Sequence, residues 1–340
     1  MADATGASAG RTVTAEPAGT HRSQGSISAS AIFFGDLAST PESGIFRAIS
    51  LRMRPLALIA LITPRVNALR ALPAPAASAP LALVSDSART TTLADELAAD
   101  TAGGASLVVF GTYAGDFNMV EYAQKLRHYL PLLEARGLSR AYAIVNGSPG
   151  AASMLSQLLD LPDRLVLLSD VEGAAGRAFG VGRGWLADRD DVSPYVKLFG
   201  MLIGLGAAGT LPSVIAGYIG NPSGVNGWIE SALLQGEEAG RWPNGVVEPD
   251  GGGGAASNSF SELPLVGGWG RRPLELATLR LQNMVGVSLA NWRELGAQDD
   301  RCITQLGGCA LLSADGEVLY EWRDTGICNT AHFEDVLSAL

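Results

Sequence analysis

Cysteine is almost missing from this 340-residue sequence, and none lies between Met1 and Arg301. The three cysteines, Cys302, Cys309 and Cys328, are too few and too odd in number for the disulfide framework of a secreted domain. Histidine is equally scarce, and its three residues form no cluster with cysteine at metal-ligand spacing. We therefore expect no metal site and no cofactor.

Positive charge is also in short supply. The chain carries 24 basic residues against 34 acidic ones, which gives a net charge of −10. A nucleic-acid-binding protein needs a basic stripe that neutralises phosphates, and none is present. The composition therefore argues against a nucleic-acid partner.

Acidic residues are absent between Glu42 and Asp86, where five arginines occur in an Ala- and Ser-rich context. This is the composition of an organelle transit peptide. It contains Met53–Arg54 followed by the short apolar run Pro55–Ile62, as in a signal sequence. We interpret residues 1–79 as a targeting leader to a plastid, cleaved or disordered, with Met53 as a candidate true start. An ordinary disordered N-terminus is the alternative, and in both cases the folded domain spans residues 80–340.

Strands and helices alternate along that domain, which predicts an α/β protein with a parallel sheet. A βαβαβα order is followed by a long, mainly helical insertion at residues 182–300 and then by a C-terminal ββα unit, a thioredoxin-like plan. Asp315-Gly316 marks the turn of the C-terminal hairpin. The predicted strands are 81–86, 106–110, 140–146, 165–169, 308–313 and 316–322, and the helices are 92–99, 119–136, 151–159, 172–179 and 330–340.

Within the insertion, Leu198–Ile229 contains no charged residue. Gly204 and Gly206 interrupt it, so we expect two short helices rather than a transmembrane span. Such a hairpin suits docking on a protein partner, or peripheral membrane contact. The candidate docking residues are Tyr195, Leu198, Phe199, Leu202, Val214 and Tyr218.

Two later segments of the insertion complete the prediction. Residues 248–261 are rich in Gly and Ser and predict a flexible loop. Residues 273–295 predict a helix with a core-packing face at helical spacing. That face consists of Leu274, Ala277, Leu281, Met284, Val285, Ser288 and Trp292.

Two shorter segments carry weaker signals. The sequence GVGRG at residues 180–184 superficially suggests a phosphate loop, but no strand precedes it and no lysine follows. The acidic cluster at residues 188–191 is interpreted as a solvated loop rather than a cation site.

The junction at residues 106–119 has the geometry of a reactive thiol site without its thiol. A strand that enters a helix through a glycine loop directs backbone N–H groups at the helix start, where a cysteine would become reactive. The loop reads GTYAGDF, and neither it nor the helix contains cysteine.

The segments SLVVFGTYAGDFNMVEYAQKL, ELATLRLQNM and QLGGCALLSADGEVLYEWRDTGI together resemble the peroxiredoxin-like AhpC/TSA family, in its cyanobacterial and plastid branch. The resemblance implies a thioredoxin fold over most of residues 81–340. When Asp116-Phe117 is set on the family's Asp-Phe pair, Ala114 takes the place of the proline and Asn118 that of the threonine. Glu121 then stands at the peroxidatic cysteine, and a carboxylate does not attack peroxide as a thiolate does.

Two functional hypotheses follow. The first is a non-catalytic, peroxiredoxin-like plastid protein, stromal or thylakoid-associated, that acts as a binding or structural module on a photosynthetic membrane complex. The alternative is an atypical thiol-dependent peroxidase or oxidoreductase that uses Cys302, Cys309 or Cys328. The missing helix-start cysteine leaves catalysis uncertain and favours the first hypothesis.

Overall fold

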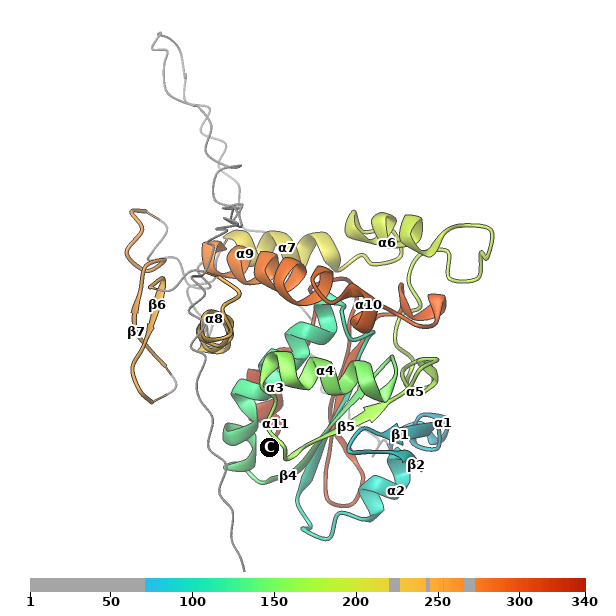
Figure 1. Cartoon of the computed structure of the whole chain (residues 1–340). Helices are drawn as coiled ribbons and strands as arrows, with labels where there is room; N and C mark the ends of the chain where they lie inside the picture. The colour runs from blue at the N-terminus through green and yellow to red at the C-terminus, as the bar shows by residue number, and fades with distance from the viewer. Residues whose placement is uncertain (1–70, 220–226, 243–244, 253, 266–272) are drawn as a thin grey trace, which may run out of the picture. The chain divides into compact units, whose positions relative to one another are not determined.

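A twisted seven-stranded sheet with helices on both faces forms the centre of the computed structural model (Figure 1). The structure describes residues 71–340 except 220–226, 243–244, 253 and 266–272. Most of the expected leader, including Met53, therefore lies outside the described residues.

The sheet has the strand order β2-β1-β5-β4-β3-β8-β9. Its three central strands β5, β4 and β3 are parallel, whereas β1 joins β5 and β8 joins β3 in antiparallel fashion. The C-terminal pair β8–β9 is antiparallel. The strands are β1 (Pro80–Leu83), β2 (Asp86–Thr92), β3 (Ala105–Phe110), β4 (Leu138–Val145), β5 (Leu165–Ser169), β8 (Gly308–Leu312) and β9 (Val318–Arg323). The expected α/β thioredoxin-like fold with a C-terminal ββα unit is confirmed.

Alternation along the strands divides the core into two layers. Leu107 and Val109 of β3 face one layer, and Val108 and Phe110 face the other. The first layer is covered by α3 (Phe117–Glu134), α4 (Pro149–Leu159) and α11 (Phe333–Ala339). The second is covered by α1 (Ala74–Ala77), α2 (Leu93–Ala98) and α5 (Ala174–Phe179).

The first predicted strand, residues 81–86, is wrong in its extent. The chain turns after Leu83, and Asp86–Thr92 returns beside it as the edge strand β2. The sequence DSARTTT gave no apolar signal because most of β2 is exposed. The following helix α2 is capped by Thr92, whose side chain accepts a hydrogen bond from the Asp95 N–H.

Residues 71–79 fall within the expected leader, yet they include α1. Ala76 is fully buried, and Ala79 is 7% exposed. The domain boundary at residue 80 stays a prediction.

The insertion is mainly helical, with one small hairpin. The expected flexible loop at residues 248–261 forms part of that hairpin, in which Glu248 pairs with Ser257. Helix α8 was not predicted, because the sequence before it offered no clear boundary. The elements are α6 (Pro194–Leu202), α7 (Thr210–Ile219), α8 (Gly227–Glu238), β6 (Val247–Pro249), β7 (Ala255–Asn258), α9 (Pro273–Gln282), the π-helix η2 (Asn283–Leu289), α10 (Trp292–Leu295) and the 3₁₀-helix η3 (Asp300–Cys302).

The short helices of the insertion agree with the expectation of no transmembrane span. Among the described residues, no helix combines the length and the apolar character that a bilayer crossing requires.

The predicted core-packing face of residues 273–295 is wrong for its large aliphatic residues, although Ser288 of that face is buried. Leu274, Leu281 and Val285 are 44–51% exposed, and Leu276 and Leu279 are buried in their place. The helix packs against α7 and α8, and it then widens into η2. A π-helix contains more residues per turn, so the facing positions shift at this point.

Candidate functional site

The loop between β3 and α3 is held tightly at both ends. A side chain on Gly111 would place its Cβ atom 2.3 Å from the Met119 sulfur and 2.7 Å from the Ile144 carbonyl oxygen, so only glycine fits. The Asn146 N–H donates to the Thr112 carbonyl at 3.0 Å. The loop therefore has the close backbone approach expected of a strand-to-helix junction in this fold.

The insertion covers this loop. The Gly115 N–H donates to the Leu295 carbonyl at 2.9 Å. The rings of Tyr113 and Trp292 meet edge to face at 6.1 Å between centroids. Ala114 is only 1% exposed. Helix α10 and the residues beside it thus cover the loop between β3 and α3.

Glu121, which the sequence resemblance places at the peroxidatic cysteine, forms a buried ion pair. Its carboxylate lies 2.9 Å from the Lys125 ammonium and 4.0 Å from the Arg280 guanidinium, and it accepts a hydrogen bond from the Thr330 hydroxyl at 2.6 Å. Burial alone would raise the pKa of Glu121, but the two cations and the hydrogen bond outweigh it and lower the pKa. This arrangement keeps Glu121 ionised and makes it a structural anion.

The Asn118 side chain links the start of α3 to residues that follow β9. The Asn118 side chain donates to Asp324 at 2.7 Å and to the Gly326 carbonyl at 3.1 Å, and its oxygen accepts from the Cys328 N–H at 2.7 Å. The start of α3 is thereby bound to the segment after β9.

Asp324 lies at the centre of this contact. It accepts hydrogen bonds from the Tyr122 hydroxyl at 2.7 Å and from the Trp322 indole N–H at 3.1 Å, in addition to Asn118. Burial raises its pKa to about 7. Burial likewise raises the pKa of Asp116, the N-cap residue of α3, to about 6.

The three thiols are free and occupy separate environments. Cys302 is fully buried and contacts the Val171 carbonyl, and Cys309 is fully buried in β8. Cys328 is partly exposed at the side of a groove and has a positive φ of 62°. Burial raises the pKa of the Cys302 and Cys328 thiols to about 12, although Arg280 acts in the opposite direction at Cys328.

We expect Cys328 to be the only thiol that an alkylating reagent modifies in the native protein. The reaction should be slow at pH 8 because the thiolate fraction is small. Iodoacetamide labelling followed by mass spectrometry should give one label per native chain and three in denaturant, and Cys328→Ser should abolish the native label. Native labelling at Cys302 or Cys309 would contradict the burial described above.

The groove beside Cys328 encloses about 300 Å³ between α7, α9 and the start of α3. Three of the predicted docking residues, Leu202, Val214 and Tyr218, line it. Phe199 and Tyr195 of α6 are 70% and 47% exposed. Leu198 is half-buried and packs against the small core below α6.

Sequence reasoning missed the polar partners of Glu121 and Asn118, namely Lys125, Arg280, Asp324 and Thr330. Charged side chains are usually exposed, so their sequence positions gave no sign of burial. The one available signal was the charged RDTG segment at the end of the last strand, which carries Asp324.

The parallel centre of the sheet, the C-terminal antiparallel pair and the closing helix define a thioredoxin-like protein. The family described as AhpC/TSA antioxidant enzyme matches residues 125–326, more than half of the chain, and the chain belongs to this family. The match includes Cys302 and Cys309, begins after Glu121 and ends before Cys328. No curated protein matches the chain.

Proposed function

We propose that this protein is a non-catalytic member of the AhpC/TSA family that acts as a binding or structural module. The buried Glu121–Lys125 ion pair carries the proposal, because it fills the place of the peroxidatic thiol with a fixed anion. The covered loop between β3 and α3 supports the same conclusion, since Ala114 is only 1% exposed there. A catalytic role would need a thiol elsewhere, and two of the three thiols are fully buried.

The docking surface in this proposal is the apolar face of α6, α7 and α9 with η2. The three helices lie along one end of the molecule, with α7 beside α9 (Figure 1). Its exposed members are Tyr195, Val196, Phe199, Ile203, Leu211, Ile215, Tyr218, Ile219, Leu274, Leu281, Val285 and Leu289.

Charge is nearly absent from this apolar face. No charged residue occurs in Leu198–Ile229. Lys197 and Glu275 are buried, and Arg280 turns toward Glu121. Large exposed apolar patches mark interaction sites, and an uncharged patch suits a protein partner with an equally apolar surface.

The compartment and the partner rest on the sequence. The acid-free, Arg-bearing stretch between Glu42 and Asp86 supports plastid import, and the apolar face supports docking on a membrane complex of the photosynthetic apparatus. The protein would then be stromal or thylakoid-associated, held by its partner.

Replacing Phe199 and Ile203 together by serine should weaken partner binding at least tenfold, because both are large and about two-thirds exposed. Stability should change little, since surface substitutions lie mostly within about 0.5 kcal/mol. Binding to detergent-solubilised thylakoid complexes, measured by co-sedimentation, checks this expectation.

Leu319→Ser is the matched control, because Leu319 is 43% exposed on the edge strand β9 and does not belong to the apolar face. It should leave binding unchanged. A wild-type protein found only as a free monomer would contradict the proposal. Equal binding to protein-free vesicles of neutral lipid would show that the bilayer itself is the occupant.

A thiol oxidoreductase is the second candidate, and the position of Cys328 favours it. Cys328 lines the groove together with Arg280 and is joined through its N–H to Asn118 at the start of α3. In such a reaction the Cys328 thiolate attacks a peroxide oxygen, the O–O bond breaks, and a sulfenic acid and an alcohol or water form. An external dithiol would then restore the thiol, become a disulfide and release water. Peroxide consumption with a dithiol donor that disappears in Cys328→Ser would establish this activity over the non-catalytic role.

A further inference from the structure

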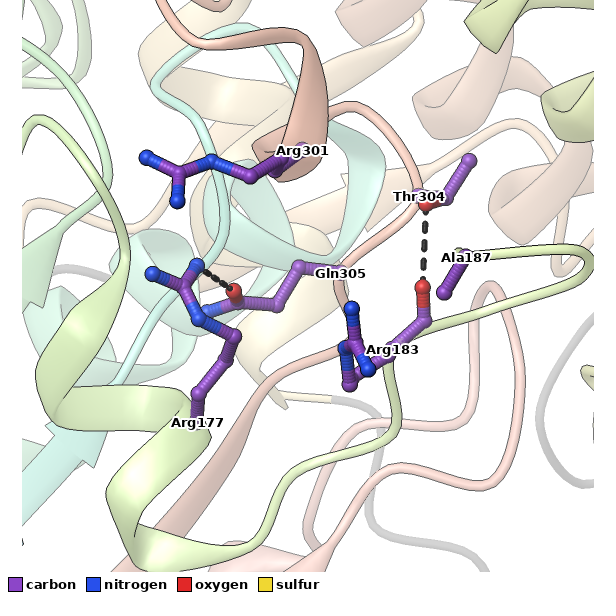
Figure 2. Close-up of a pocket in the computed structure, with 6 residues that line it drawn as sticks. All are labelled: Arg177, Arg183, Ala187, Arg301, Thr304 and Gln305. Carbon is purple, nitrogen blue, oxygen red and sulfur yellow. Dashed lines mark hydrogen bonds between the residues drawn. The ribbon is translucent and has the colours of Figure 1, made fainter. Parts of the chain in front are cut away.

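Three arginines from separate segments surround a pocket of about 260 Å³ that the proposed function does not use (Figure 2). Arg177 belongs to α5, Arg183 follows that helix, and Arg301 lies in η3. Thr304 and Gln305 complete the polar lining. We propose that this pocket binds a small phosphate-bearing molecule, of the size of a phosphate or a diphosphate group.

The chain holds the pocket in place through Gln305. Its side-chain N–H donates to the Gly173 carbonyl at 3.1 Å, and its oxygen accepts from Arg177 at 2.9 Å (Figure 2). A side chain on Gly173 or Gly176 would place its Cβ atom 2.8 Å from the Gln305 amide. Small residues at these two positions therefore allow Gln305 to reach α5 and orient the Arg177 guanidinium.

The opposite side of the pocket is fixed by the segment before β8. The Thr304 hydroxyl donates to the Arg183 carbonyl at 3.0 Å (Figure 2). The Leu306 N–H donates to the Gly182 carbonyl at 2.8 Å. The segment GVGRG is thus hydrogen-bonded to residues 304–306, which precede β8. These bonds give the pocket a defined shape.

Three carboxylates compete with an incoming anion. Arg301 pairs closely with Asp299 and lies 3.1 Å from Glu172, and Arg183 lies 2.6 Å from Asp188. Glu172 and Asp188 are 67% and 79% exposed, so their ion pairs are weak and screened by salt.

Arg177 differs from the other two arginines. Within the described part of the chain it forms no ion pair, and it uses its Nη1 group on the Glu172 carbonyl and on Gln305. A diphosphate could therefore bind Arg177 directly and displace the exposed Glu172 and Asp188 from their partners.

Guanidinium groups match phosphate oxygens in geometry and charge, which identifies the ligand class. The pocket also lies where this class of sheet binds ligands. Strand β5 ends at Ser169, and α5 follows it, so the pocket is near the carboxyl end of a parallel strand. Its volume is just below that of a drug-sized site, which suits a small anion.

Inorganic pyrophosphate is the probe that tests this proposal, by isothermal titration of the full chain at constant ionic strength. We expect saturable binding to one site. Arg177→Gln should weaken it roughly tenfold or more, as should Arg183→Gln, because each loses a charge-assisted contact. Arg177→Lys keeps the positive charge but lacks the planar guanidinium group with its paired N–H donors. Its affinity for pyrophosphate should lie between those of the wild type and Arg177→Gln.

Arg189→Gln is the matched control. Arg189 is an exposed arginine that pairs with Asp191 and does not line the pocket. It should leave pyrophosphate binding unchanged. No saturable heat up to about 10 mM, or equal losses in Arg189→Gln and Arg177→Gln, would overturn the proposal, since the second result means diffuse attraction. This outcome is independent of partner docking by the apolar face.

Discussion

Glu121→Ala is expected to lower the free energy of unfolding by about 3–5 kcal/mol, the largest effect of any single substitution considered for this protein. The change removes the carboxylate that Lys125 and Arg280 share, so these two cations would remain charged at 7% and 13% exposure. The Thr330 hydroxyl would also lose its acceptor. Urea unfolding at pH 7, followed by circular dichroism, measures the difference.

Two companion variants separate charge from packing. Glu121→Gln keeps the size and one oxygen, so it should be destabilised by less than Glu121→Ala. Glu121→Ala combined with Lys125→Met removes the ion pair and refills part of the space, and it should recover a large share of the loss. A double variant as unstable as the sum of its single variants would show that the ion pair contributes nothing.

The direction of the pH dependence follows from the lowered pKa of Glu121. A carboxyl group whose pKa is lowered on folding stabilises the protein above its unfolded pKa, and this contribution disappears as the pH falls through the folded pKa. The contribution of Glu121 is therefore complete at neutral pH, and its loss is confined to acidic solution below about pH 4.

The sequence predicted the fold because short apolar runs alternate with segments of helical periodicity. Val108 and Phe110 of β3 face one layer while Val109 faces the other, as expected of a continuous apolar run that forms a strand buried on both faces. The edge strand β2 could not be found in this way, because its polar residues are held by pairing with β1 rather than by burial.

The buried side of the helices in the insertion could not be predicted from the sequence, for a different reason. A helix with apolar residues on several sides does not reveal which side is buried, and residues 273–295 are of this kind. The neighbours α7 and α8 select Leu276 and Leu279, and the π-helix then brings Val287 inward. The exposed remainder, including Leu281 and Val285, extends the apolar face beyond the residues that the sequence had suggested.

The candidate site was predictable in position but not in chemistry. The glycine loop and the missing cysteine were evident from the sequence, and Glu121 could be aligned through the resemblance. Its partners Arg280 and Thr330 lie about 160 and 210 residues further along the chain. Only the tertiary fold brings such distant polar groups together, and one sequence carries no record of their pairing.

Asp324→Asn is expected to change the pH dependence of stability by roughly 2–3 kcal/mol between pH 5 and pH 8. Burial raises the pKa of Asp324 to about 7, above its unfolded value near 4. The folded protein therefore binds a proton that the unfolded chain releases, so this group favours folding at pH 5 and ceases to do so as the pH rises through 7. Asparagine resembles the neutral acid at every pH and removes this dependence.

The free energy of unfolding is measured for the wild type and for Asp324→Asn from pH 5 to pH 8. The difference between the two proteins at each pH is used, because the contributions of all other titrating groups are common to both and cancel. Those groups include Asp116, which acts in the same direction, and His128, whose pKa is lowered by burial and which acts in the opposite one. As the pH falls, the free energy of unfolding of the wild type should rise relative to that of the variant. The change is equivalent to about 5–10 °C in melting temperature. A constant difference across this range would mean that Asp324 is ionised throughout, held by Tyr122, Asn118 and Trp322. In that case Asp324 would contribute equally to stability at every physiological pH, whereas a changing difference shows that ionising this buried carboxyl group costs stability as the pH rises.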